Sequence, residues 1–335
     1  MSTEEPLVDI GVPVAGRADY VAVALDSVLR QTVDRWRLVV QQDGPEDPAV
    51  AEAVRPYLTD PRVSLRSTGT QLGAAANMTR LIAEGTAPYV ALLHDDDAWD
   101  AGFLERRLDA LEQHPACGYA FSRVRIIDSS GHAYEESRAP VREGVHDSHS
   151  FAPLLLRMNV VPSPSLVVRR SAYEAVGAAF STRLRRIYDH EMWSRLALCF
   201  PVFFLDIADA SWRVHEGQSS RSLHDRREDF LNFQAILEPL ARAEIGTYAP
   251  TRGEWDRIVS SWLLTNALDA AEAGEGRLAR ADIAYAIRLH TGRAVDPRVP
   301  AGILAVAAGP PGNRALAAIR TRIRRRGIRV HISTL

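Results

Sequence analysis

A run of four polar residues follows directly on a short apolar segment at residues 89–93, and these residues are His94, Asp95, Asp96 and Asp97. An apolar segment of this length is typical of a strand that is buried on both faces of a sheet. Because adjacent carboxylates repel one another, the run would be stabilised by a hard divalent cation, Mn²⁺ or Mg²⁺. Open α/β sheets bind their ligands at the carboxyl ends of the strands, where this run would lie. A solvated turn before the next helix is the structural alternative.

Strands and helices alternate over the first 113 residues, and this alternation must position the acidic run. Four strands are predicted, at residues 7–14, 36–41, 62–66 and 89–93. Four helices are predicted, at residues 18–31, 48–58, 73–84 and 102–113. Strands that alternate with helices favour right-handed crossovers and a mostly parallel sheet.

The pattern changes after Pro115, where the sheet is expected to become mixed. Further strands are predicted at residues 118–127, 165–169, 202–206 and 212–215, and one helix is predicted at residues 189–200. The polar residues 140–150 predict a surface loop. Beyond residue 222 only helices are predicted, at residues 225–243, 254–273, 276–289 and 301–325. The chain ends in an arginine-rich segment, which is typical of contact with anionic lipid or of a solvated tail.

The composition excludes several kinds of chemistry. The chain has 335 residues, of which 46% are hydrophobic, and this is enough for a large core. All 40 basic residues are arginine, which excludes a lysine-dependent phosphate loop, a kinase-type lysine and a pyridoxal-phosphate Schiff base. The net charge of −2 argues against nucleic acid as a partner. Cys117 and Cys199 lack zinc or disulfide spacing, and without a signal peptide or membrane span a cytoplasmic protein is expected.

Five segments of the chain together resemble the family 2 glycosyltransferases, which have a GT-A fold. They are VDIGVPVAGR, LDSVLRQTVDRWRLVVQQDG, QLGAAANMTRLIAEGTAPYVALLHDDDAW, IYDHEMWSRLA and WRVHEGQSS. The resemblance implies a Rossmann-like, mostly parallel sheet flanked by helices, in a catalytic domain at residues 1–222. Its nucleotide-sugar half would span about residues 1–115 and its acceptor half about residues 116–222. A helical C-terminal region with a basic tail would follow at residues 223–335.

The resemblance also implies which residues bind the nucleotide sugar. These are Pro13, Val14, Asp43, Gly73, Asn77, Asp95 and Asp96. A carboxylate at the edge of the sheet, such as Asp43, can accept hydrogen bonds from a base or ribose, and the first position of a turn is its structural alternative. The start of a helix explains Gly73 almost as well. Family members usually have Asn, an acidic residue and often Arg where this chain has Gly16, Gln42 and Ala76, so the base and the sugar are not implied.

The reacting groups follow from the same resemblance. Asp96 corresponds to the metal ligand of the family, Asp97 to a second or supporting ligand, and His215 to a position that closes over the diphosphate or binds the metal. The cation would stabilise the charge on the departing nucleoside diphosphate. Asp189 corresponds to the general base, which takes the proton of the acceptor hydroxyl in an inverting displacement. Glu191 is a competing candidate for the base, and a helix N-cap is the structural alternative for Asp189.

The implied function is that of an inverting hexosyl- or deoxyhexosyltransferase. It would use a UDP-, dTDP- or GDP-linked donor and a hydroxyl acceptor, in the assembly of cell-envelope polysaccharide or a natural product. A nucleotidyltransferase or pyrophosphatase could use a similar sheet and acidic cluster, and a non-catalytic nucleotide-sugar-binding subunit is a third hypothesis. Peripheral membrane contact through the basic C-terminus and a homo-oligomer both remain open.

Overall fold

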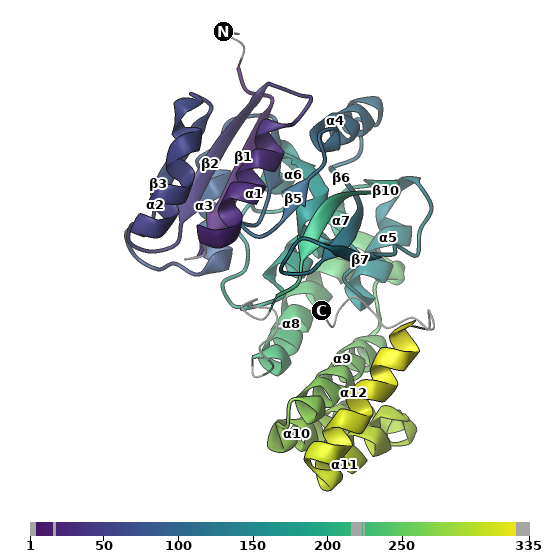
Figure 1. Cartoon of the computed structure of the whole chain (residues 1–335). Helices are drawn as coiled ribbons and strands as arrows, with labels where there is room; N and C mark the ends of the chain where they lie inside the picture. The colour runs from purple at the N-terminus through teal and green to yellow at the C-terminus, as the bar shows by residue number, and fades with distance from the viewer. Residues whose placement is uncertain (1–4, 16–17, 216–222, 224, 326–335) are drawn as a thin grey trace. The chain divides into compact units, whose positions relative to one another are not determined.

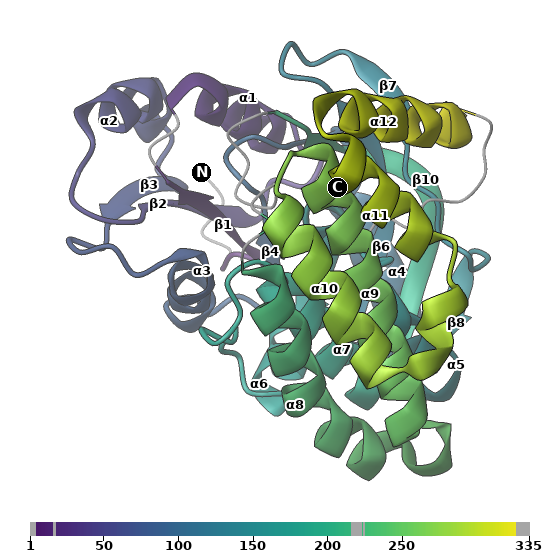
Figure 2. The same ribbon diagram turned by 90° about the horizontal axis from the view of Figure 1, so that it is seen from below.

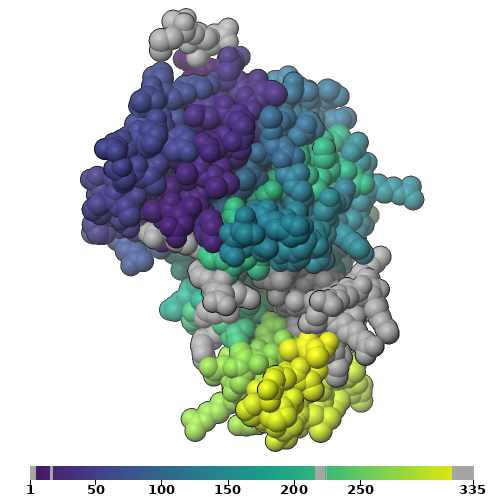
Figure 3. Space-filling view, in the orientation of Figure 1, coloured from purple at the N-terminus to yellow at the C-terminus, as the bar shows by residue number. Residues whose placement is uncertain are grey.

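The computed structural model describes residues 5–15, 18–215, 223 and 225–325, and for residues 319–325 it describes the backbone only. The chain folds into two compact units, at residues 1–216 and 217–335 (Figure 1). Figure 3 shows one face of the chain in space-filling form, in the same colours. The first unit contains the acidic run, and the second unit is helical.

The described part of the first unit contains one mixed sheet of ten strands in the order β3-β2-β1-β4-β9-β6-β10-β5, with β7 paired to β6 and β8 paired to β10. The strands are β1 Val8–Val14, β2 Trp36–Gln42, β3 Val63–Ser67, β4 Tyr89–Leu92, β5 Ala98–Trp99, β6 Tyr119–Ile127, β7 Ala133–Glu136, β8 Gly144–His146, β9 Leu166–Arg169 and β10 Val202–Arg213. β1 to β4 pair in parallel, whereas β9 runs antiparallel to both β4 and β6. The sheet is therefore parallel where the sequence predicts alternation and mixed after Pro115, as expected.

Helices cover both faces of the parallel half of this sheet. The helices of this unit are α1 Ala18–Leu29, α2 Pro48–Val54, α3 Ala74–Ala83, α4 Phe103–Gln113, α5 Ser148–Arg157, α6 Arg170–Ala175 and α7 Tyr188–Cys199, with 3-10 turns η1 Arg55–Thr59 and η2 Ser163–Ser165. Figure 2 shows α1 and α2 on one side of β1 to β3 and α3 on the other side. Helix α3 lies very close to β1, because a Cβ atom on Gly11 would be 3.1 Å from Leu81. A glycine is therefore required at this position of the central strand.

Two predictions for the second half of this unit are wrong. The strands predicted at residues 202–206 and 212–215 form the single strand β10, which stays paired with β6 through two register shifts near Ala208. β-bulges of this kind let a strand continue across polar residues that interrupt its pattern. The surface loop predicted at residues 140–150 contains β8 and the start of α5, where the Asp147 carboxylate accepts a hydrogen bond from the Ser150 amide at 2.8 Å.

A buried ionic network attaches α4 to the sheet. The guanidinium of Arg107 is fully buried and donates to both carboxylate oxygens of Asp209 on β10, at 2.9 and 2.7 Å. Ser122 on β6 donates a third hydrogen bond to the same carboxylate at 2.9 Å. A buried charge is tolerated when it is paired and its hydrogen bonds are satisfied, so this network fixes the helix that follows the acidic run.

The second unit consists of helices in its described residues. They are α8 Arg226–Ile245, α9 Arg252–Glu272, α10 Gly276–Leu289, α11 Arg298–Ala308 and α12 Pro310–Arg325, with 3-10 turns η4 Gly246–Tyr248 and η5 Thr291–Val295. The single helix predicted at residues 301–325 is therefore wrong. Gly309 has φ +61 and Pro310 follows it, and together they separate α11 from α12. The arginines beyond residue 325 lie outside the described residues.

No helix in the described residues combines the length and the apolar character that a bilayer-spanning segment needs.

Candidate functional site

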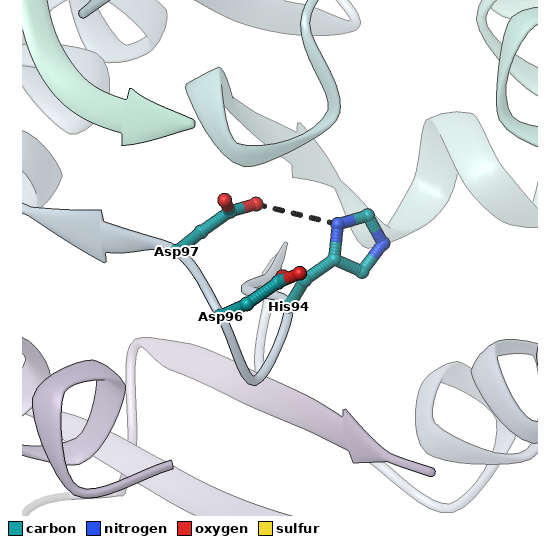
Figure 4. A group of neighbouring side chains, drawn as sticks. All are labelled: His94, Asp96 and Asp97. Carbon is teal, nitrogen blue, oxygen red and sulfur yellow. Dashed lines mark ion pairs between the residues drawn. The ribbon is translucent and has the colours of Figure 1, made fainter. Parts of the chain in front are cut away.

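The acidic run forms a tight turn between β4 and β5, at the carboxyl end of the parallel strands. Figure 4 shows the side chains of His94, Asp96 and Asp97 extending from this single turn. One ligand atom from each of these three residues lies within 4.8 Å of the other two. His94 Nδ1 is 3.4 Å from Asp97 Oδ2. The turn therefore gathers two carboxylates and one imidazole at the edge of the sheet.

The end of β10 holds the turn from the other side. The backbone amide of Arg213 donates to Asp97 Oδ1 at 2.9 Å, and its Nε donates to the carbonyl of Asp96 at 2.9 Å. His215 follows two residues later and lies with Nε2 3.0 Å from Asp96 Oδ2. The ring of Tyr20 on α1 contacts both residues, with its centroid 5.4 Å from that of His215 and 4.6 Å from the Arg213 guanidinium carbon. The acidic turn and the end of β10, whose bonded residues are 116 to 119 positions apart in the sequence, therefore form one site.

The site has an excess of negative charge. Burial and the neighbouring Asp96 carboxylate together raise the pKa of Asp97 to about 6. Burial alone would lower the pKa of His94, but the carboxylates of Asp97, Asp96 and Asp189 raise this pKa to about 9. Both shifts mean that the cluster favours bound positive charge.

The residues present fit a divalent cation. Asp97 Oδ2 is buried, and it lies 3.4 Å from His94 Nδ1, which is itself a candidate ligand atom. Two carboxylates and imidazole nitrogens form a ligand set that suits Mn²⁺, and the carboxylate oxygens alone suit Mg²⁺. The structure brings together the three predicted ligands, Asp96, Asp97 and His215, and adds His94 to them.

The residues predicted to bind the nucleotide near the end of β1 differ in the exposure of their side chains. Pro13 is partly exposed, whereas the side chain of Val14 is only 1% exposed and packs in the core. Asp95 is buried beside this strand end, where its Oδ2 accepts a hydrogen bond from the Ala15 amide at 3.4 Å. The predicted contact of Val14 with the nucleotide stays a prediction, and Asp95 joins the ends of β1 and β4.

Asp43 connects the end of β2 to the loop before α3. Its two carboxylate oxygens accept hydrogen bonds from the amides of Leu72 at 2.6 Å and Gly73 at 2.9 Å. Gly73 has φ +85, a backbone conformation that side-chain-bearing residues rarely adopt, and it is the N-cap residue of α3. Both residues thus have a structural reason for their identity, in addition to the predicted contact with a donor.

Asn77 is buried on α3 and bonded to the end of β2. Gln41 Nε2 donates to Asn77 Oδ1 at 2.6 Å, and Asn77 Nδ2 donates to the carbonyl of Gln41 at 3.3 Å. Its side chain is 1% exposed. These two hydrogen bonds connect α3 to the end of β2, next to the residues that are predicted to bind the nucleotide.

Asp189 lies in the first turn of α7, and both of its carboxylate oxygens are held. The Ser163 hydroxyl donates to Oδ2 at 2.7 Å, and the amide of His190 lies 2.7 Å from Oδ1. Ser163 belongs to the 3-10 turn η2, whose Pro164 carbonyl accepts a hydrogen bond from Trp99 Nε1 at 2.6 Å. Because Trp99 is two residues after Asp97, the turn that holds Asp189 is tied to the acidic turn.

Glu191 occupies a different environment. Its side chain is buried and forms an ion pair with Arg195 at 2.7 Å, and burial raises its pKa. Asp189 is partly exposed and close enough to His94 to affect the pKa of that histidine. Of the two carboxylates, Asp189 is therefore the one that faces the acidic turn.

Sequence reasoning missed three residues of this site. His94 was quoted as part of the acidic run without a role, and Ser163 and Arg213 had no role. Arg213 is the last residue of β10, which the sequence divides in two, so its position opposite the acidic turn depends on the register of that strand. Ser163 precedes Asp189 by 26 residues, and a Ser-Pro-Ser turn alone carries no signal for such a contact.

The architecture and the site together define the class of protein. A mixed α/β sheet with flanking helices, which carries an acidic turn at the carboxyl end of its parallel strands, is the architecture of the GT-A fold, as predicted. The family model for Glycosyl transferase family 2 matches residues 9–177, and the chain belongs to this family.

Relatives in the curated proteins are distant. An uncharacterized glycosyltransferase of Rickettsia felis is 24% identical over 229 residues, which cover 67% of this chain and 37% of that protein. The putative teichuronic acid biosynthesis glycosyltransferase TuaG of Bacillus subtilis is 25% identical over 132 residues, covering 39% of this chain and 52% of TuaG. The match thus spans about a third to a half of these two proteins.

Solved structures share the fold at low identity. Residues 1–349 of TarS from S. aureus, in complex with UDP-GlcNAc, align with a TM-score of 0.61 at 16% identity, covering 96% of this chain and 92% of that one. The mannosyltransferase PcManGT from Pyrobaculum calidifontis, in complex with GDP-Man and Mn²⁺, aligns with a TM-score of 0.52 at 18% identity, covering 92% and 88%. At these identities the likeness establishes the fold alone.

Proposed function

We propose that this protein is an inverting glycosyltransferase that transfers a hexose or deoxyhexose from a nucleoside-diphosphate donor to a hydroxyl acceptor. The observation that carries the proposal is the approach of Asp189 to the acidic turn, where its carboxylate helps to raise the pKa of His94. An inverting displacement needs a base on one side of the reacting carbon and a stabilised leaving group on the other. The two acidic centres supply these two functions.

Asp96, Asp97, His94 and His215 would hold a divalent cation, which supplies positive charge for the diphosphate when it is bound. Asp189 would accept the proton of the acceptor hydroxyl as that oxygen attacks the anomeric carbon and the bond to the diphosphate breaks. Ser163 would orient the receiving carboxylate, since its hydroxyl is bonded to Oδ2. No covalent intermediate with the protein is needed in this displacement.

Solved structures that share the fold support the choice of donor, and a relative that shares sequence supports the choice of pathway. TarS and PcManGT, which share the fold, are solved with UDP-GlcNAc and with GDP-Man and Mn²⁺. TuaG, which shares sequence, is described as a teichuronic acid biosynthesis enzyme. We therefore infer a UDP-, GDP- or dTDP-linked donor and an acceptor in cell-envelope polysaccharide synthesis.

The test is slow donor hydrolysis, in which water replaces the unknown acceptor. The protein is incubated with UDP-, GDP- and dTDP-sugars and Mn²⁺, and the released nucleotide is identified. Metal-dependent release of nucleoside diphosphate, with inversion at the anomeric carbon seen by NMR, is expected. Release of nucleoside monophosphate would instead indicate a pyrophosphatase or nucleotidyltransferase. Donor binding without release would indicate a non-catalytic subunit.

A further inference from the structure

Helix α11 of the second unit has no polar or charged side chain after its first residue, Arg298, and only one of its faces is covered. Ile303 is 48% exposed and Leu304 is 68% exposed. The other exposed members of this face are Pro300, Ala307 and Ala308. Their spacing of three to four residues aligns them on one side of the helix. A helix without a polar face is usually buried, so the exposed side of α11 is suited to an apolar environment.

The opposite side of α11 is packed within its own unit. Val299 and Ala305 are buried, and a Cβ atom on Gly302 would be 3.1 Å from Ile283 on α10. The 3-10 turn η5 precedes α11, and its last residue, Val295, is 87% exposed. We call the exposed apolar residues of these two consecutive elements, Val295, Ile303 and Leu304, the α11 patch.

The charge of the second unit is divided along the sequence. Residues 223–275 contain five arginines and ten acidic residues, whereas residues 276–335 contain twelve arginines and only two aspartates. The formal charges are therefore −5 and +10. Both aspartates in the basic part are paired, Asp282 with Arg227 and Asp296 with Arg298 at 2.8 Å. The basic part thus carries a positive charge that its own carboxylates do not cancel.

Arginines of this basic part adjoin the C-terminal end of α11. At the start of α10, a Cβ atom on Gly276 would be 2.9 Å from Val306 of α11, and the next residue, Arg277, is exposed. Arg280 lies one turn further along α10 and is also exposed. Helix α12 begins two residues after α11 ends, and Arg314 in its second turn is exposed. The α11 patch is therefore an apolar surface in a strongly basic segment.

We propose that the α11 patch and its adjoining arginines dock on the surface of a bilayer that contains anionic lipid. Exposed apolar residues flanked by arginine are what a peripheral membrane surface requires, since the apolar side chains enter the acyl boundary and the cations contact the headgroups. A second copy of the chain is a poorer occupant, because symmetric contact would bring two segments of charge +10 together. This proposal does not depend on the identity of the donor or of the acceptor.

The experiment is sedimentation of the full chain with vesicles of phosphatidylcholine alone or with phosphatidylglycerol. We expect binding only to the anionic vesicles, and weaker binding as salt is raised. Leu304→Glu should reduce the partition coefficient at least tenfold, and Arg314→Ala should reduce it about fivefold. The control is Leu58→Glu, since Leu58 is a 43% exposed apolar residue of the first unit. It should leave the partition coefficient unchanged.

Three results would overturn the proposal. One is equal binding to neutral and anionic vesicles, and another is no vesicle binding by the parent chain. The third is a dimer in analytical ultracentrifugation that Leu304→Glu dissociates, which would assign the patch to self-association. Circular dichroism of each variant checks that folding is retained. Because Leu304 is exposed, its replacement by Glu should leave the melting temperature within a few degrees of the parent.

Discussion

Replacing Asp189 by Asn should abolish turnover while retaining donor binding. Asparagine has almost the same shape as aspartate, and its side-chain oxygen can still accept the hydrogen bond from the His190 amide. The Ser163 hydroxyl can reverse its role and accept from the new amide, so the local structure is preserved. What the variant loses is the ability to take a proton at this position. A positioned base contributes about 10²–10⁴ in rate, which corresponds to about 3–5 kcal/mol of transition-state stabilisation.

The assay separates turnover from binding. Donor hydrolysis at saturating donor gives the rate, and isothermal titration with the same donor and Mn²⁺ gives the dissociation constant. The Asn variant should be at least a hundredfold slower, with a dissociation constant within about threefold of the parent. Asp109→Asn is the matched control, because Asp109 is an exposed carboxylate on α4 and its variant should keep the parent rate.

A second variant tests the competing carboxylate. Glu191→Gln breaks the buried ion pair with Arg195, so it should lower the melting temperature but leave the rate of the folded enzyme within a fewfold of the parent. If the Asp189 variant hydrolysed donor at the parent rate, Asp189 would not be the base. If the Glu191 variant lost turnover without losing stability, Glu191 would take that role instead.

Three further predictions concern the residues that support the site. Ser163→Ala should lower kcat about tenfold without changing the KM for donor, because the Ser163 hydroxyl is the group of η2 that orients Asp189. Ser163→Thr keeps a hydroxyl and should restore kcat. An unchanged kcat in the Ala variant would show that the hydrogen bond is dispensable. Burial lowers the pKa of His190 from 6.5 to about 4, so the unfolded chain takes up this proton first as the pH falls from 6.5 to 4. The unfolding free energy should decrease by about 3 kcal/mol across this range through His190 alone, and urea titrations of His190→Gln should show a shallower decrease; equal slopes would refute the buried neutral imidazole. Asp209→Asn should lower the unfolding free energy by about 3–5 kcal/mol, since it leaves Arg107 buried without a countercharge, and a loss below 1 kcal/mol in urea unfolding would contradict the role of that network.

The parallel half of the fold follows from the sequence because its signals are local. Each strand from β1 to β4 is short, with apolar residues in succession or in alternation, and each helix between them has apolar residues at helical spacing, so a window of some ten residues is enough to recognise either. Strand β10 lacks such a local signal along its whole length. Two aspartates, Asp206 and Asp209, interrupt its middle, and it stays a strand there because β6 supplies a partner through the bulges. Pairing between distant segments overrides local propensity there.

The candidate site likewise contains residues that have a local signal in the sequence and residues that have none. The acidic run could be recognised because three carboxylates in succession are a local signal of cation binding. The contacts of Arg213 and His215 with that run depend on the order of strands in the sheet, and only the family resemblance indicated His215. Asn77 and Val14 are predicted to contact the nucleotide from their place in the motif, and the structure shows in addition that both are buried, which the motif does not indicate. A position in a family motif indicates that the residue has a fixed environment. It does not indicate whether that environment serves ligand binding or the stability of the fold.

The hydrogen bond from the Trp99 indole to the Pro164 carbonyl has a mechanical consequence. It joins the segment after the acidic turn to the 3-10 turn that holds Asp189, so a direct bond sets the separation of these two segments. In the proposed mechanism the sugar lies between them, and this bond would then limit how large that sugar can be.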